Sequence, residues 1–162
     1  MLTNYKVFLE KANNRIAVYL DKKLDKLPVK DLILVSILLH DLGKKETIIN
    51  YEDGSSFFPL HERVSVIKSK KILDKLNCSW PEKRYIINII KNHSYLHSIV
   101  DEDNKKLSDQ FNQLIVKKSS VFVFGLIVMV MMDITDSYLK QTMPQKYNFS
   151  IDFYNQKLEV LT

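Results

Sequence analysis

The hydrophobic positions of this chain recur mostly at helical spacing. Apolar residues three and four positions apart predict a first helix over about Thr3 to Leu20. One side of that helix would carry four residues at this spacing: Val7, Asn14, Ala17 and Val18. The run LILVSILLHD is apolar nearly all round, so a central, buried helix is predicted over about Val29 to Leu42. Gly43 follows it, and we expect a left-handed C-cap there.

The segment 46–58 departs from the helical pattern. Two β-prone pieces flank Asp53–Gly54, a dipeptide typical of tight turns, and predict a short β-hairpin. After Pro59 the helical spacing returns, and it predicts further helices over about Leu60 to Leu76, Pro81 to His93, Leu107 to Val116 and Ser119 to Lys140, with a short amphipathic helix at the end. We therefore expect an all-α bundle of about six or seven helices in a single domain, residues 1–162.

Composition excludes several classes of protein. The 162 residues include 3 glycines, 4 prolines and 1 cysteine, too few for a many-stranded barrel, a glycine-rich nucleotide loop or a disulfide framework. The lone Cys78 favours a reducing, cytoplasmic setting. The most apolar run, Val121 to Met132, has 12 residues, whereas a membrane span needs about 20. It therefore predicts a buried core helix, and no membrane partner is expected.

The chain is basic, with 24 Lys and Arg against 19 Asp and Glu and a net charge of +5. Much of this charge comes in lysine pairs: Lys22–Lys23, Lys44–Lys45, Lys70–Lys71, Lys105–Lys106 and Lys117–Lys118. Because the pairs are scattered, they favour a solvated surface over a dedicated nucleic-acid stripe. Their field would still attract phosphate-bearing ligands.

Three of the four histidines fall on faces that are predicted to be buried. His40 ends the most apolar helix, His93 continues a stripe of isoleucines, and His61 shares a side with small serines. Asp41 and Asp133 also fall in apolar surroundings, where an unpaired carboxylate is costly. Each residue alone has an ordinary structural explanation as a hydrogen-bonded core group or a helix cap. Together they indicate a divalent-metal site, because imidazole and carboxylate suit Mn, Fe, Ni or Zn, and carboxylate and water suit Mg.

The segment ILLHDLGKKE resembles the signature of the HD superfamily of metal-dependent phosphohydrolases, with His40–Asp41 as the doublet and Gly43–Lys44 completing the HDxGK form. A glycine-bearing hairpin, FFPLHERVSVIKSKKIL, IINIIKNH and VMMDITD follow it in order. The whole pattern, from about Asn14 to Asp136, is similar to the HD domain of bacterial tRNA nucleotidyltransferases (CCA-adding enzymes) and their stand-alone relatives. It implies an HD domain alone, since 162 residues leave no room for a nucleotidyltransferase domain.

The resemblance also implies roles for particular residues. His40, Asp41 and Asp133 match metal ligands of the family, which binds one or two divalent ions. His61 and His93 match positions that complete a second metal site in binuclear members, or that touch the substrate phosphate in mononuclear ones.

One position departs from the family pattern. Asn14 stands about where the family has its first histidine ligand, so it is a candidate degenerate ligand. An amide oxygen is a poorer ligand than imidazole for a borderline metal.

Catalytic roles follow from this assignment. Asp41 would hold the metal and orient a water molecule, and Lys44 would neutralise charge that develops on the phosphate. His61 or His93 would protonate the leaving group or hold a second metal. Glu62 would fix the tautomer of an imidazole, or would be a carboxylate that the helix dipole favours in a first turn.

Three functions remain open from the sequence. The leading hypothesis is a divalent-metal-dependent phosphohydrolase that acts on a nucleotide, a cyclic nucleotide or another small phosphate ester. The alternative is a degenerate HD domain that binds a nucleotide, RNA or a protein partner without turnover, and Asn14 supports it. The third is a helical protein whose polar cluster is purely structural. We interpret His97 as a surface or rim residue and Asp136 as a solvated carboxylate at a helix end.

Overall fold

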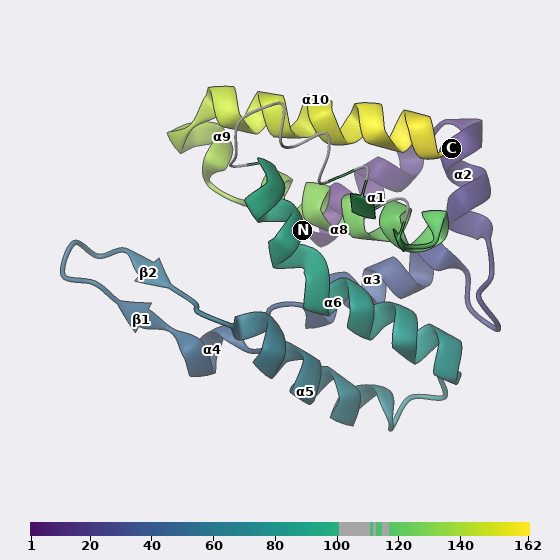
Figure 1. Cartoon of the computed structure of the whole chain (residues 1–162), viewed down its shortest axis with the longest axis horizontal. Coiled ribbons are helices and arrows are strands. Elements are labelled where there is room, and N and C mark those ends of the chain that lie inside the picture. The colour runs from purple at the N-terminus through teal and green to yellow at the C-terminus, as the bar shows by residue number, and fades with distance from the viewer. Residues whose placement is uncertain (101–110, 112, 115–116) are drawn as a thin grey trace.

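Helices make up most of the computed structural model, which describes residues 1–100, 111, 113–114 and 117–162, with the backbone alone at 98–100 (Figure 1). In chain order the elements are α1 (Leu2–Lys11), α2 (Asn14–Asp21), α3 (Val29–Leu39), α4 (Lys44–Thr47), β1 (Ile49–Asn50), β2 (Ser56–Phe57), α5 (His61–Leu73), α6 (Trp80–Val100), α8 (Ser120–Asp136), α9 (Leu139–Thr142) and α10 (Pro144–Leu161). The predicted all-α bundle with a short hairpin is confirmed. Within the described residues, no helix is both long and apolar enough to span a membrane.

The core is built around α8, which is buried from Phe122 to Met132. It packs against α3, α6 and α10, and α6 in turn packs against α5. Helix α8 begins at Ser120, is capped by Ser119, whose hydroxyl accepts the N–H of Phe122, and ends at Asp136. It is therefore shorter than the predicted helix to Lys140, and the single-turn helix α9 follows it. Because α8 is surrounded by other helices, it could be apolar on every side, as its sequence predicted.

The first predicted helix is in fact two helices. The Asn13 side chain accepts the backbone N–H of Ile16 at 3.0 Å and caps α2, so the chain breaks between Lys11 and Asn14. The prediction of one shared apolar side is wrong, because Val7 is 39% exposed and Val18 is 62% exposed. A local cap has overridden the apolar periodicity here.

The hairpin has the predicted position, and it extends away from the helices (Figure 1). Ile49 pairs with Phe57 and Asn50 pairs with Ser56 in antiparallel register. Gly54 adopts a φ of +81°, the left-handed conformation for which this turn needs glycine.

Gly43 has a different role from the predicted left-handed cap. Helix α3 ends at Leu39, and Gly43 has a φ of −89°, so that prediction is wrong. A Cβ atom at Gly43 would lie 2.3 Å from the carbonyl oxygen of His61 and 2.7 Å from the backbone nitrogen of Ser65. The Gly43 N–H donates to the Ser65 hydroxyl at 2.8 Å. Glycine is therefore required because the backbone of α5 lies directly against it.

The remaining boundaries differ by a few residues or more. Helix α5 ends at Leu73, before the predicted Leu76, while α6 continues from Trp80 well beyond the predicted His93. The extension of α6 is held by tertiary contacts: Leu96 is fully buried, and its carbonyl accepts the Tyr154 hydroxyl of α10 at 2.7 Å. Most of the helix predicted near 107–116 lies outside the described residues. Helix α10, at 18 residues, is longer than the short closing helix that was predicted.

Candidate metal centre

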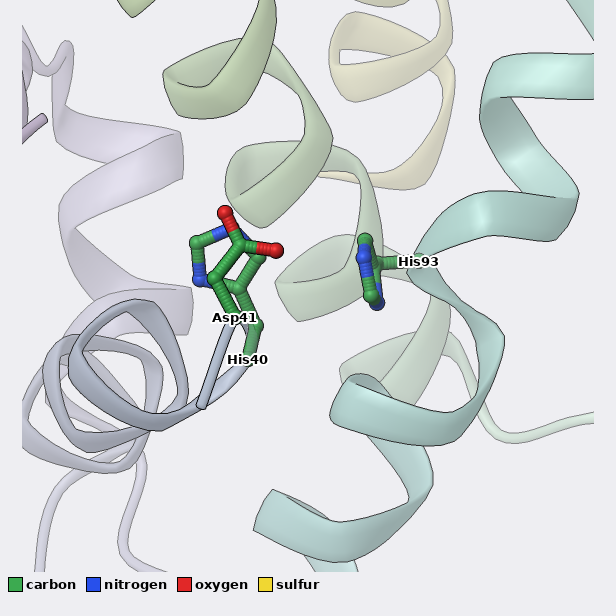
Figure 2. A group of neighbouring side chains, drawn as sticks. All are labelled: His40, Asp41 and His93. Atoms are coloured by element: carbon green, nitrogen blue, oxygen red, sulfur yellow. The ribbon is translucent and has the colours of Figure 1, made fainter. Parts of the chain in front are cut away.

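Three histidines from three separate elements converge on one interior point. His40 is the residue that caps the end of α3, His61 begins α5, and His93 lies in α6. The ring centroids of His40 and His61 each lie 5.1 Å from that of His93. His93 extends from α6 toward the His40–Asp41 pair (Figure 2). Residues spread over 54 positions of the chain, 40 to 93, therefore share a single cluster.

All three imidazole rings are oriented in the same way by the backbone. In each ring Nδ1 lies within hydrogen-bond distance of the carbonyl oxygen three residues earlier, at 2.9 Å for His40, 2.9 Å for His61 and 2.7 Å for His93. A carbonyl oxygen can only accept, so each Nδ1 must carry the hydrogen. In the neutral ring, Nε2 then holds the free electron pair. This is the arrangement by which proteins orient imidazoles to ligate a metal.

The Nε2 atoms of the histidines lie close to one another, and the Ser94 hydroxyl lies 3.4 Å from Nε2 of His93. Nε2 of His61 lies 3.1 Å from Nε2 of His93, and two free electron pairs at that distance repel each other unless a proton or a cation lies near them. Nε2 of His40 and Oδ1 of Asp41 are buried without a well-aligned hydrogen bond among the described residues, and their nearest polar neighbours are the ion-pair partners of the same cluster. Buried polar atoms without partners are costly, and a cation would satisfy these acceptors together. The residues present therefore fit a divalent metal ion.

The two predicted carboxylates lie beside the histidines. Asp41 places Oδ2 3.0 Å from Nε2 of His40 and Oδ1 3.4 Å from Nε2 of His61. Asp133 reaches the same place from α8, with Oδ1 3.7 Å from Nε2 of His40. One ligand atom from each of His40, Asp41 and His93 can be chosen so that all lie within 4.8 Å of one another. This group could hold a metal ion, with His61 and Asp133 at its edge.

Without a metal, the cluster combines one neutral ring, His93, with three charged groups, His40, Asp41 and Asp133. Burial lowers the pKa of His93 to about 4, so this ring is neutral near pH 7. Burial also lowers the pKa of His40, but the Asp133 and Asp41 carboxylates outweigh it and raise that pKa to about 9 when no metal is present. Burial raises the pKa of Asp133 and of Asp41, yet the neighbouring cations outweigh it and hold both pKa values below the ordinary range. Both aspartates are therefore charged.

Two further predicted residues border the cluster. Lys44 Nζ lies 2.7 Å from Oδ2 of Asp41, so its charge stands beside the doublet. Glu62 Oε2 lies 3.7 Å from Nδ1 of His61, but the hydrogen bond that orients this ring is made by the Phe58 carbonyl. Glu62 therefore adds negative charge next to His61, and the backbone fixes the tautomer.

Asn14 lies away from this cluster. It is exposed in the first turn of α2, and in the described part of the chain no hydrogen bond or ion pair joins it to the histidines. Its neighbour Asn13 is the cap of that helix. The structure therefore gives Asn14 no contact through which it would act as a ligand.

The position of His97 at the metal centre was not predicted from the sequence. Its Nε2 lies 2.7 Å from Oδ2 of Asp133, and its side chain is 34% exposed, so it connects the buried cluster to the surface. The signal was available, because His93 and His97 are four residues apart and share one face of α6. Asp136 also has an unpredicted partner, the N-terminal ammonium group of Met1.

A cavity of about 290 Å³ opens beside the cluster. Its lining includes both charged and hydroxyl side chains: Lys44, His97, Asp133, Ser137, Lys146 and Ser150. Lys44 precedes the hairpin, while Lys146 comes from α10, so two lysines distant in sequence line the same space. A small anion in the cavity would meet positive charge from both residues and would lie next to Asp133.

Comparisons of the chain with protein-family models, with curated proteins and with solved structures gave no match. The chemistry of the site must therefore be argued from its own side chains. Those side chains offer imidazole nitrogens and carboxylate oxygens to a cation, and lysine ammonium groups to an anion in the adjoining cavity.

Proposed function

We propose that this protein is a divalent-metal-dependent phosphohydrolase that acts on a nucleotide, a cyclic nucleotide or another small phosphate ester. The observation that carries the proposal is the shared orientation of three histidines, whose Nδ1 atoms are held by backbone carbonyls and whose Nε2 atoms meet beside Asp41. This arrangement supports metal binding, because the backbone carbonyls that hold Nδ1 leave the Nε2 atoms of clustered imidazoles facing one another and the Asp41 carboxylate.

The residues divide the work of such a reaction between them. His40, Asp41 and His93 would hold the ion, and Asp133 and His61 lie close enough to join them. A divalent ion supplies Lewis-acid activation of water and of the phosphoryl group. Mn, Ni, Fe and Zn suit the mixed nitrogen and oxygen ligands, and Mg suits the oxygens.

The cavity next to the cluster supports a small phosphate ester as the substrate. Lys44 and Lys146 line it, and each could attract a phosphate oxygen and stabilise negative charge that develops during cleavage. Its volume of about 290 Å³ lies near the lower end of small-molecule sites. A mononucleotide or a smaller ester therefore suits it better than a polymer.

His97 is the best-placed proton donor to a leaving group. His97 lines the cavity, and its Nε2 is hydrogen-bonded to Asp133, which would hold the imidazole ring in place. His93 is a poorer donor, because burial lowers its pKa to about 4 and leaves the ring neutral. We therefore propose His97 as the acid in place of His61 or His93, which the sequence alone had suggested.

A metal-resolved hydrolysis panel tests the proposal. The purified chain, stripped of metal and then supplied separately with Mn, Ni, Fe, Zn or Mg, is assayed for phosphate release from mononucleotides, 2′,3′-cyclic nucleotides and p-nitrophenyl phosphate. We expect turnover with at least one metal, and its loss in Asp41→Asn. Asp74→Asn is the matched control, because Asp74 is 71% exposed and pairs with Lys83. Turnover that survives in Asp41→Asn would assign it to a contaminant and overturn the proposal.

Binding of a nucleotide without turnover is the second candidate function. The exposed position of Asn14, where the family pattern has a histidine ligand, favours it. In that case the metal binds, a mononucleotide binds, and the panel releases no phosphate with any metal.

A further inference from the structure

An exposed aromatic and cationic platform lies at the start of α6, outside the metal centre. Trp80, the single tryptophan of the chain, is the first residue of α6, and it is 69% exposed. The guanidinium of Arg84, one helical turn later, lies 5.1 Å from the centroid of the indole ring. An indole left this exposed gains little from burial, so it is available to stack on a planar ligand.

Two adjoining cavities form a groove around this platform. Their volumes are about 440 Å³ and 420 Å³, and they share four lining residues: Trp80, Arg84, Asn88 and Lys118. We call the two together the α6 groove. Each half has the size of a small-molecule site, so the groove has room for more than one planar group in succession.

The lining of the α6 groove is strongly basic. Five cations line it: Lys70, Lys83, Arg84, Lys117 and Lys118. Among the described residues its one carboxylate is Asp74, which lies 3.0 Å from Lys83. These cations come from α5, from α6 and from the segment before α8, so Lys70 and the pair Lys117–Lys118, far apart in the sequence, converge here. Such a concentration of positive charge attracts a polyanion.

We infer that the α6 groove binds single-stranded nucleic acid, with a base stacked on Trp80 and the phosphates close to the surrounding cations. Sites for single strands combine a basic channel with aromatic side chains, because every base offers a flat face whatever the sequence. An acidic peptide would satisfy the charges but would not use the exposed indole. A duplex would keep its bases stacked inside and away from Trp80.

The α6 groove is separate from the metal centre. Trp80 and His93 are 13 residues apart on the same helix, which places them about 20 Å apart along its axis. The inference therefore does not rest on the proposed hydrolase function. Strand binding can fail while metal binding holds, and the reverse is also true.

Tryptophan fluorescence gives a direct test, because Trp80 is the only tryptophan in the chain. The full-length protein is titrated with a twelve-residue oligouridylate, and we expect its emission to be quenched as a base stacks on the ring. Inorganic polyphosphate should compete for the groove without quenching, since it has charge but no bases. The logarithm of the binding constant should fall linearly with the logarithm of the salt concentration, with a slope of about −0.7 for each phosphate contacted. Equal quenching by polyphosphate would overturn the stacking model.

Three variants complete the experiment, with affinity measured by the anisotropy of a labelled oligouridylate. Trp80→Leu should weaken binding about 5- to 150-fold, which corresponds to the loss of one stacked base. Arg84→Ala should also weaken binding of the oligouridylate. If Trp80→Leu does not fold, Arg84→Ala serves as the test variant. Lys11→Ala is the control, because it removes one exposed positive charge on α1, outside the groove.

Several results would overturn the inference. If Trp80→Leu folds and binds as tightly as the wild type, stacking is excluded. If Lys11→Ala weakens binding as much as Arg84→Ala does, the attraction comes from overall charge and not from the groove. Binding of polyglutamate as tight as that of oligouridylate would instead assign the groove to an acidic protein partner.

Discussion

Gly43→Ala tests how the metal centre is built, because Gly43 is the point where the His40–Asp41 turn meets α5. The added Cβ would lie 2.3 Å from the His61 carbonyl oxygen and 2.7 Å from the Ser65 backbone nitrogen. Ordinary contacts between such atoms are about 3.5 Å, so α5 must move by about 1 Å. Both obstacles are backbone atoms of a helix, so no side chain can turn aside to relieve the overlap.

The expected loss of stability can be worked from these contacts. Overpacking of this kind costs about 1–3 kcal/mol. Weakening the hydrogen bond from the Gly43 N–H to Ser65, 2.8 Å long, adds about 1 kcal/mol. We therefore expect Gly43→Ala to lower the free energy of unfolding by about 2–4 kcal/mol, measured by urea denaturation followed by circular dichroism.

The same movement should weaken metal binding. His61 begins α5, and its Nε2 lies 3.1 Å from that of His93 and 3.4 Å from Oδ1 of Asp41. A displacement of about 1 Å disturbs both distances, and we expect about 10- to 100-fold lower metal affinity by calorimetry, as for lost support around a site.

Gly54→Ala is the matched control for this experiment. Gly54 has a φ of +81° and nothing within 4 Å of an added Cβ, so its substitution should cost about 1–2 kcal/mol of stability and leave the metal affinity unchanged. If the free energy of unfolding of Gly43→Ala lies within about 0.5 kcal/mol of the wild-type value, and the variant binds metal equally well, the close approach of α5 does not shape the metal centre.

Three further predictions concern the core and the ion. Glu82 is fully buried and accepts the Ser79 N–H and two loop N–H groups before α3, so Glu82→Gln should cost about 2–3 kcal/mol in urea denaturation. Burial raises the pKa of Glu82, but the hydrogen bonds from these backbone N–H groups outweigh burial and lower that pKa below 4.5. The stabilisation by the charged Glu82 should therefore be complete above pH 4.5 and should be lost as the pH falls below 4.5. Glu82→Gln should lack this pH dependence. A bound divalent ion at 100 times its Kd should stabilise the protein by about 2.7 kcal/mol, and His93→Gln should lose most of that gain in thermal melting with and without chelator. Tyr154→Phe removes the 2.7 Å hydrogen bond to the buried Leu96 carbonyl and should lower the free energy of unfolding by about 1–2 kcal/mol. An unchanged melting curve would contradict this and would show that water replaces the hydroxyl.

Much of the fold was encoded locally. The apolar runs of α3 and α8, and the Asp53–Gly54 turn, predicted a helical protein with one hairpin, because periodicity and turn chemistry act over a few neighbouring residues. The same reasoning failed at Asn13, where a side-chain cap divides one apolar pattern into two helices. It also placed the end of α6 too early, since Leu96 and Tyr154 hold that end through contacts between distant segments.

By itself the sequence determined that the His40 and His93 rings would be buried, because periodicity turns their faces inward. It also predicted Asp41 and Asp133 beside them, although these two side chains stay partly exposed, at 33% and 26%. Only the tertiary structure decided how they are oriented. Backbone carbonyls fix the three rings, His97 joins Asp133 across two helices, and Gly43 lets α5 approach. Periodicity shows that a face is buried, but it does not show which other face it meets. The close approach of two backbones, or the meeting of two side chains 36 residues apart, depends on how all the helices pack together.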